Sequence, residues 1–496
     1  MTRRVWRIAA VALVGTACAR GIQPGPPGST PVDRRDDVER LIRAGCYRCL
    51  RDALVLVDEG HAVERRFDVL ALLASRVREV GVIDEVDWRA RAESAAPADD
   101  ARTALILAVV DQKRQPQGGR VFDQLDVTPA RRDEIEIADS AVWPATPSDP
   151  VDRYFFLTLR CTGLISGDAS LDGKLGPNDS PLIGYRRATC GRVEADALDE
   201  LRVAEPRFSE THYFSALAAL NAGRILATER ALEAFAVLFP RATAADFLHG
   251  QVLLALEEFE PAAEAFARVL RVMPSMPEAL LYHMRTESQV DPARGEAAAN
   301  RLVSLGTWHQ GEAYYWRAWN RRALKRLDEA AADIETAKRV LYNAAVPKLA
   351  GFIAYERGDM PLAEAELVES MRRDASDCEV QFAIGQVLIR TRRWPEAATR
   401  FVSTVACSRT MQEALSRRLT ELPDAELDPA RRGRLEARIE RQRAAERARE
   451  GLATYSAASA LAVSGRPAEA RPLAESALNW PDLRVKAEQL LTQLPR

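Results

Sequence analysis

The most reactive side chains in this 496-residue sequence belong to seven cysteines. The first, Cys18, follows a short apolar run. The remaining six are Cys46, Cys49, Cys161, Cys190, Cys378 and Cys407. An even number of cysteines in an exported chain indicates disulfide pairing, because the compartments outside the cytoplasm are oxidising. The chemistry that we expect of these six residues is therefore covalent bracing of the fold.

Cys46 and Cys49 form a Cys-Tyr-Arg-Cys motif that is open to three interpretations. A thiol-redox pair needs a helix N-terminus that follows a strand in a βαβ arrangement, and the surrounding sequence has no such pattern. A zinc site needs a second pair of ligands at suitable spacing, which is not found here. A structural disulfide or a pair of packing cysteines is the favoured interpretation.

Residues 167–181 carry oxygen-bearing side chains at the spacing of a calcium-binding loop. The ligands would be Asp168, Ser170, Asp172 and Asp179, with Gly173 at the sharp turn. Asp179 replaces the usual bidentate glutamate, however, and Pro177 stiffens the second half of the loop. A polar loop closed by Cys161 and Cys190 is therefore favoured over a metal site, and no cofactor is predicted.

The sequence contains no recognisable catalytic constellation. Its five histidines stand alone in helical contexts, and no nucleophile elbow, phosphate-binding loop, zinc-protease helix or dinucleotide fingerprint is present. Charged residues make up 28% of the chain, so the many carboxylates are expected on solvated helix faces. The net charge of -3 provides no basic excess for nucleic acid. We therefore predict a protein that is not an enzyme and does not bind nucleic acid.

The chain begins with features of an export signal. Three arginines among the first seven residues precede the apolar run Ile8 to Val14, which is too short to span a bilayer. The stretch resembles a bacterial lipoprotein signal, in which Cys18 would be lipidated and become the mature N-terminus. Gly15 departs from this pattern, because a leucine is commoner there. By the same resemblance, Ala19 after the cysteine implies the outer membrane.

The resemblance implies a signal peptide at residues 1–17. The proline- and glycine-rich residues 18–35 then predict an extended tether between the lipid and the first helix. We expect the protein in the bacterial cell envelope, lipid-anchored at the outer membrane and facing the periplasm. Simple secretion is the alternative, and no other segment of the sequence could span a membrane.

A sequence pattern repeats at intervals of 33 to 34 residues between Thr243 and Thr410. Each unit has a small residue, an alanine 12 positions later and a large apolar residue four positions after that. The four sets are Gly250, Ala262, Phe266; Ala318, Ala330, Ile334; Gly351, Ala363, Leu367; and Gly385, Ala397, Phe401. Small residues allow two helices to approach closely, and the large residue fills the space above them, so each unit predicts a helical hairpin.

This pattern resembles the tetratricopeptide repeat family, and Phe247 to Pro274 is its best copy. Weaker copies begin near Ser209 and in the C-terminal segment, and Pro277 to Gln310 is a degenerate copy. We count about seven repeats. The predicted fold class is an all-α, right-handed solenoid of such hairpins, preceded by a helical N-terminal region.

The predicted organisation continues from the tether in five segments. Residues 36–150 form a helical region that includes a hairpin at Asp36–Glu59 and Val63–Val80, one interpretation being a diverged repeat. The others are residues 151–208, a helix and cysteine-closed loop; 209–411, the repeat array; 412–450, a charged helical connector; and 451–496, a C-terminal repeat. The connector carries charges of both signs at helical spacing, which is typical of a solvated helix that bridges two repeats.

The resemblance implies that one face of the first helix of each repeat lines the inside of the superhelix, where partners bind. The predicted binding residues are Phe247, Gln251, Tyr315, Trp319, Arg322, Lys348, Phe352, Tyr355, Phe382 and Gln386. Aromatic and arginine side chains are favoured at binding hot spots. Packing between repeats is the alternative role for some of them. Arg317 and Arg321 occupy core-like positions, which suggests that their helix is rotated.

Hairpin geometry also predicts a disulfide, because Cys378 opens one helix and Cys407 ends the antiparallel helix that follows. Cys161 and Cys190 have the same separation and are predicted to pair. The functional hypothesis is an envelope-anchored, non-enzymatic scaffold or adaptor that binds a protein or peptide segment in its groove. The alternative is an envelope hydrolase or a glycan-binding component with its site in residues 84–204.

Overall fold

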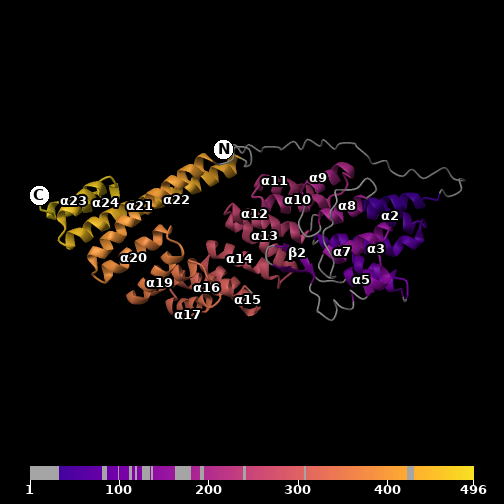
Figure 1. Cartoon of the computed structure of the whole chain (residues 1–496), viewed down its shortest axis with the longest axis horizontal. Coiled ribbons are helices and arrows are strands. Elements are labelled where there is room, and N and C mark those ends of the chain that lie inside the picture. Colours follow the sequence, from indigo (N-terminus) through magenta and orange to yellow (C-terminus); the bar gives the residue numbers. More distant parts are fainter. Residues whose placement is uncertain are drawn as a thin grey trace, which may run out of the picture.

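The computed structural model describes residues 33–80, 86–98, 100–110, 114–117, 120–125, 135, 138–161, 180–189, 195–237, 239, 242–306, 309–421 and 429–495. The molecule is elongated, with the N-terminal helices at one end and the last helices at the other (Figure 1). The predicted signal peptide, Cys18 and nearly all of the tether lie outside the described residues. None of the described helices combines the length and the apolar character that crossing a membrane requires.

The N-terminal part consists of short helices around one apolar core. They are α1 (Arg35–Ala44), α2 (Tyr47–Asp58), η1 (Val63–Arg65), α3 (Arg66–Glu79), α4 (Trp88–Ser94), α5 (Ala101–Val110), α7 (Pro150–Cys161), α8 (Pro181–Ala188) and α9 (Ala195–Ala204). Gly45 separates α1 from α2, with φ of 67° and a backbone N–H that donates to the Leu41 carbonyl. An added Cβ there would lie 2.5 Å from Leu182. The continuous helix expected over Asp36–Glu59 is therefore broken into two.

Two short strands depart from the all-helical expectation. β1 (Arg114–Gln117) and β2 (Arg120–Leu125) pair as an antiparallel hairpin. Strand β1 lies against α14 (Pro277–Val290), so this hairpin reaches the repeat array across a long interval of sequence (Figure 1).

Buried aromatic rings hold the N-terminal helices to the start of the array. Arg76 of α3 is fully buried, and its guanidinium carbon lies 3.7 Å from the centre of the Tyr185 ring. The Tyr185 ring stacks on Phe208 at 4.7 Å. Glu210, the first residue of α10 (Glu210–Asn221), is also buried and accepts a bond of 3.0 Å from the Tyr47 backbone N–H. The N-terminal helices and the array are therefore joined by a continuous core.

From α10 onward the chain forms seven successive hairpins and a final helix. After α10 the helices are α11 (Ile225–Ala236), α12 (Thr243–Ala255), α13 (Phe259–Val272), α14, α15 (Pro292–Ser304), α16 (Gln310–Ala323), α17 (Leu327–Lys338), α18 (Ala345–Arg357), α19 (Met360–Arg373), α20 (Cys378–Arg390), α21 (Trp394–Thr420), α22 (Pro429–Val463), α23 (Pro467–Ala477) and α24 (Pro481–Gln493). Each packs against the next. This number of hairpins agrees with the sequence count, and the fold is the predicted α-solenoid.

The small and large residues of the repeat pattern meet within each hairpin, as predicted. A Cβ added to Gly250 would lie 2.8 Å from the Phe266 ring, and one added to Gly351 would lie 2.6 Å from Leu367. The side chains of Phe266 and Leu367 are fully buried. The two helices can therefore approach this closely at the seams only because glycine has no side chain.

The charged segment 412–450 is not a separate element. Helix α21 runs through the expected boundary at residue 411, and α22 runs through the one at 450. The two helices pack along each other and extend well beyond the length of the other hairpins (Figure 1). The predicted long helix is therefore the first part of α22, and its neighbour is α21 of the same chain.

Candidate functional site

A groove with a volume of about 660 Å³ lies on the array. Its lining comes from the first helices of four successive repeats and from neighbouring turns. The lining residues are Leu254, Glu257, Phe259, Arg285, Gln289, Glu312, Tyr315, Trp316, Leu341, Asn343 and Ala345. We call this depression the array groove. Aromatic, amide and charged side chains together make a surface that can hold both apolar and polar parts of a ligand.

Helix α16 contributes the aromatic wall of the array groove. Tyr315 and Trp316 stand edge to face with ring centres 5.5 Å apart, and Trp319 follows at 6.1 Å from Trp316. Trp319 is 36% exposed, which is high for so large an apolar side chain. Three adjacent aromatic rings on one helix therefore form a continuous ridge beside the groove.

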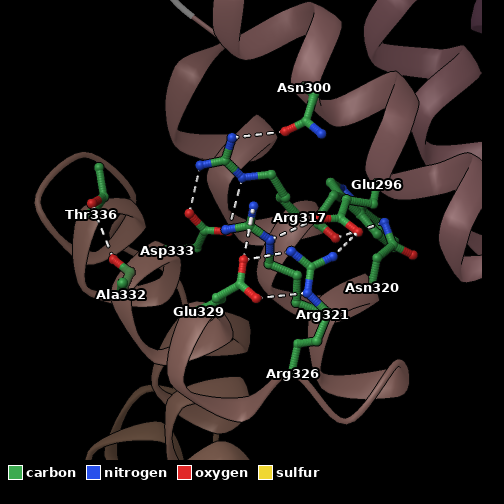
Figure 2. Close-up of polar contacts among 11 residues, drawn as sticks. Glu296, Asn300, Arg317, Asn320, Arg321, Arg326, Glu329, Ala332, Asp333 and Thr336 are labelled. Carbon is green, nitrogen blue, oxygen red and sulfur yellow. Dashed lines mark hydrogen bonds and ion pairs between the residues drawn. The ribbon is translucent and has the colours of Figure 1, made fainter.

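A network of ion pairs joins α16 to its two neighbouring helices (Figure 2). The Arg317 guanidinium donates to both oxygens of Asp333 on α17, at 2.9 and 2.6 Å. Arg321 donates to Asp333 at 2.7 Å and to Glu296 of α15 at 2.8 Å. Bidentate arginine–carboxylate contacts set orientation as well as distance. Helix α16 is therefore held against both α15 and α17 by the two arginines.

The expected rotation of this helix is wrong. Ala318, between the two arginines, is fully buried and belongs to the same core cluster as Ala330 and Ile334. The repeat register is therefore kept. Arg317 and Arg321 are accommodated at core-like positions because Asp333 and Glu296 neutralise them there.

Charged residues next to the aromatic ridge remain ionised. Lys348 of α18 bonds to Asp377 and Glu379 at 2.8 and 2.7 Å. Burial opposes its charge, but these carboxylates raise its pKa overall. The Arg322 guanidinium carbon lies 5.0 Å from the centre of the Phe352 ring, a cation–π contact. Burial raises the pKa of the Tyr315 hydroxyl against the opposing effect of the Lys348 charge, so that side chain stays a hydrogen-bonding neutral group.

The structure separates the predicted binding residues into two classes. Phe247 is only 1% exposed, and its ring packs at 5.7 Å from both Phe266 and Tyr282, so its prediction as a binding residue is wrong. The remaining nine are partly or substantially exposed: Gln251, Tyr315, Trp319, Arg322, Lys348, Phe352, Tyr355, Phe382 and Gln386. Of these, Tyr315 lines the array groove directly.

Sequence reasoning missed Arg285, Gln289 and Trp316. Arg285 stands 34 residues after Gln251 and 34 before Trp319, so it occupies the equivalent position of the intervening repeat. That repeat was treated as degenerate and its surface was not considered. Applying the repeat interval to it would have predicted Arg285. No sequence pattern pointed to Trp316, which lies between two positions of the expected face.

The hairpin seams decide the fold type, since each pairs a small residue with a large one at the predicted interval. The array is an all-α solenoid of tetratricopeptide-like hairpins. Neither a family model nor a curated protein matches the sequence. Solved structures similar to it include YrrB, a tetratricopeptide repeat protein with an unusual peptide-binding site, at 17% identity and a TM-score of 0.34, covering 46% of this chain and 99% of YrrB. A second is TTC0263, a thermophilic tetratricopeptide repeat protein of Thermus thermophilus, at 20% identity and 0.30, covering 41% and 98%.

A third similar structure is the Cut9–Hcn1 hetero-tetramer of the APC/C. The identity is 15% and the TM-score is 0.41, with 73% of this chain and 69% of the other chain covered. These likenesses concern the fold. The binding properties of this tetratricopeptide-like array are argued below from its own side chains.

The cysteine predictions have two outcomes. Cys378 and Cys407 form the predicted disulfide, with Cα atoms 5.6 Å apart. Cys46 and Cys49 also form a disulfide, both residues are fully buried, and the Cys46 sulfur caps α2 by accepting the Cys49 N–H. This favours the structural interpretation of the motif. Cys190 and the Cys161 side chain lie outside the described residues, so their pairing stays a prediction.

The proposed calcium ligands Asp168, Ser170, Asp172 and Asp179 also lie outside the described residues. In the part that the structure describes, no group of three or more His, Cys, Asp or Glu side chains is placed to hold a metal ion. Two histidines approach buried carboxylates, namely His283 with Glu287 at 3.4 Å and His309 with Glu278 at 4.0 Å. The first contact lies within α14, and the second joins α14 to the residue that precedes α16.

Proposed function

We propose that this protein is a non-enzymatic scaffold whose tetratricopeptide-like array holds a segment of a partner protein in the array groove. The observation that carries the proposal is the groove of about 660 Å³ whose walls come from successive repeats. Residues from four successive repeats would contact different parts of an extended ligand at once. The aromatic ridge supplies apolar contact area, and Arg285, Gln289 and Asn343 supply hydrogen-bonding groups.

The experiment compares partner capture by immobilised full-length protein with that by two groove variants, Trp319→Ala on the aromatic ridge beside the groove and Arg285→Ala in its lining. Each should lower the affinity for a partner from envelope extracts by about 1–3 kcal/mol, the usual cost of truncating an interface anchor. Tyr342→Ala is the matched control, because Tyr342 is 77% exposed but does not line the groove. Equal capture by wild type and both groove variants would reject the groove as the binding site.

Thermal melting separates a binding role from a packing role. Trp319 is 36% exposed, so its truncation should lower stability by less than the roughly 3–5 kcal/mol expected for a fully buried tryptophan. A loss as large as that, together with lost binding, would mean that the side chain supports the array instead of contacting the partner.

We also propose that the scaffold is anchored by a lipidated Cys18 at the bacterial outer membrane, with the array in the periplasm. The basic start, the short apolar run and the cysteine that follows are the support for this assignment. Cys18→Ser should move the protein from the membrane fraction to the soluble fraction, while Cys378→Ser should leave it in the membrane fraction. Retention of the Cys18 variant in detergent-extractable membranes contradicts the lipid anchor.

A further inference from the structure

The α21–α22 hairpin extends beyond its own repeat, and its overhanging tip reaches back to the first repeats of the array. Helix α22 has 35 residues, about 52 Å at the rise of an α-helix. Its C-terminal half forms the last hairpin with α23, whereas its N-terminal half extends beyond this hairpin toward α11 (Figure 1). We call residues 429–441 the arm.

Arginines on the arm pair with glutamates of α11 and of the turn between α12 and α13. Arg431 pairs with Glu229 and lies 3.6 Å from Glu258. Arg434 donates to Glu258 at 2.6 Å, and Arg438 pairs with Glu257. Arg434 and Glu258 are 176 residues apart in the sequence, and Arg431 and Glu229 are 202 residues apart. The arm therefore closes a very long loop of chain through charged side chains.

The arm is held to the first repeats by these side chains and not by a packed helix interface. The close helix neighbours of α22 are α20, α21, α23 and α24, and none of α11, α12 and α13 is among them. The Arg434–Glu258 pair, in which the arginine side chain is 56% exposed, is weakened by salt, because the screening length falls from about 10 Å at 0.1 M to about 3 Å at 1 M. The more buried Arg431–Glu229 pair is screened less. A contact made mainly of ion pairs can open without loss of a hydrophobic core.

The arm and the array groove share a residue. Glu257 lines the groove beside Phe259 and is also the partner of Arg438. The arm therefore stands at the end of the groove formed by the α12–α13 turn. Opening of the arm would free the Glu257 carboxylate and uncover that end of the groove.

We propose that the arm is an electrostatic latch that controls access to the α12–α13 end of the array groove. In the closed state, Arg431, Arg434 and Arg438 of the arm are neutralised by glutamates of the first repeats. An acidic partner segment can compete for the same arginines, since a carboxylate on the partner offers them equivalent contacts. The proposal rests on the proposed function only in taking the groove as the binding site.

The test measures the distance between spin labels introduced by unnatural amino acids at Gly433 on the arm and Ala255 at the end of α12, in the full-length protein. Both positions are exposed. Wild type should show a short distance at low ionic strength and a growing longer-distance population at high salt. Glu257→Lys with Glu258→Lys should shift the population to long distances even at low salt. Adding Arg434→Glu and Arg438→Glu should restore the short distance, because the charges are then exchanged.

Two control variants, Arg441→Glu and Glu260→Lys, each reverse one charge near the latch without removing any of its ion pairs. Arg441 is the last residue of the arm, and Glu260 lies at the start of α13; neither side chain makes an ion pair within the described part of the chain. Both should keep the wild-type distance. Circular dichroism confirms that each variant retains its helical content, so a failure to fold is recognised separately.

Oxidative footprinting of Phe259 and Trp316 then tests access to the groove, since both side chains line it. Their modification should increase in the Glu257→Lys, Glu258→Lys variant and return to the wild-type level in the charge-exchanged variant. The latch would be overturned if the distance between the labels changed neither with salt nor on charge reversal, or if the charge exchange failed to restore the short distance. An unchanged footprint in the opened variant would also overturn it. These measurements use no partner, so they fail or succeed independently of the scaffold function.

Discussion

Replacing Gly385 by alanine should destabilise the array, although alanine is normally the better helix former. Gly385 faces Phe401 across the seam between α20 and α21, and an added Cβ would lie 2.5 Å from the nearest ring carbon. The Phe401 ring is 1% exposed and packs at 5.4 Å from Phe382. It cannot move away without displacing its neighbours, since a packed interior has few voids.

The magnitude follows from two opposing terms. Gly→Ala within a helix gains about 0.5–1 kcal/mol from reduced backbone entropy. Overpacking at a rigid buried contact costs about 1–3 kcal/mol. Gly433→Ala in α22 isolates the first term, because nothing lies within 4 Å of its added Cβ. The two variants should therefore differ in unfolding free energy by the overpacking cost, about 1–3 kcal/mol.

Urea unfolding followed by circular dichroism measures this difference, provided that the m-value stays constant between variants. The double variant Gly385→Ala, Phe401→Leu should lose less stability than the sum of its single changes, because the smaller side chain relieves the collision. If Gly385→Ala proves as stabilising as Gly433→Ala, the close-approach explanation of the repeat pattern is refuted. Strict additivity in the double variant would refute the assignment of Phe401 as the colliding group.

Three further predictions concern contacts elsewhere in the array. Asp333→Asn should cost about 3 kcal/mol, because two largely buried arginines lose their shared carboxylate, whereas the exposed Glu335→Gln should change stability little; urea unfolding compares them. Cys407→Ser should lower stability by about 3–4 kcal/mol for a loop of 29 residues and should abolish the effect of reductant on this repeat, as seen by thermal melting with and without dithiothreitol. Burial lowers the pKa of His283 below its ordinary value of 6.5, so the unfolded chain binds the proton more tightly and stability falls as pH drops below that value. His283→Gln should flatten this dependence of stability on pH in melts between pH 5 and about pH 7. An unchanged dependence in the variant would contradict the burial of a neutral His283.

The repeat register and the helix seams could be predicted because they depend on contacts close in sequence. Ala262 and Phe266 follow Gly250 at fixed intervals, and a two-helix hairpin brings these positions together whatever surrounds it. The Cys378–Cys407 disulfide follows from the same local geometry. The count of hairpins was predictable for this reason as well, since a solenoid is a sum of such local units.

The exposed surface of the array depends on how neighbouring repeats stack, which the spacing within one repeat does not contain. Phe247 occupies the expected binding face, yet it is only 1% exposed. Tyr282 of the next repeat stacks on Phe266 at 5.4 Å and packs against the Phe247 ring, which it helps to cover. Arg317 and Arg321 appear misplaced in sequence until Asp333 and Glu296 are seen to surround them. Each of these outcomes is set by a residue of another helix.

The sequence by itself determined the helical hairpins, their number and the residues at their seams, because hairpin contacts span fewer than 34 residues and repeat with the chain. Only the tertiary structure decided which first-helix side chains line the array groove and where the arm makes contact. The reason is that small rotations between repeats accumulate along a solenoid and set the path of the whole superhelix. Whether Arg438 of α22 meets Glu257 of an early repeat depends on that accumulated path, and no local pattern records it.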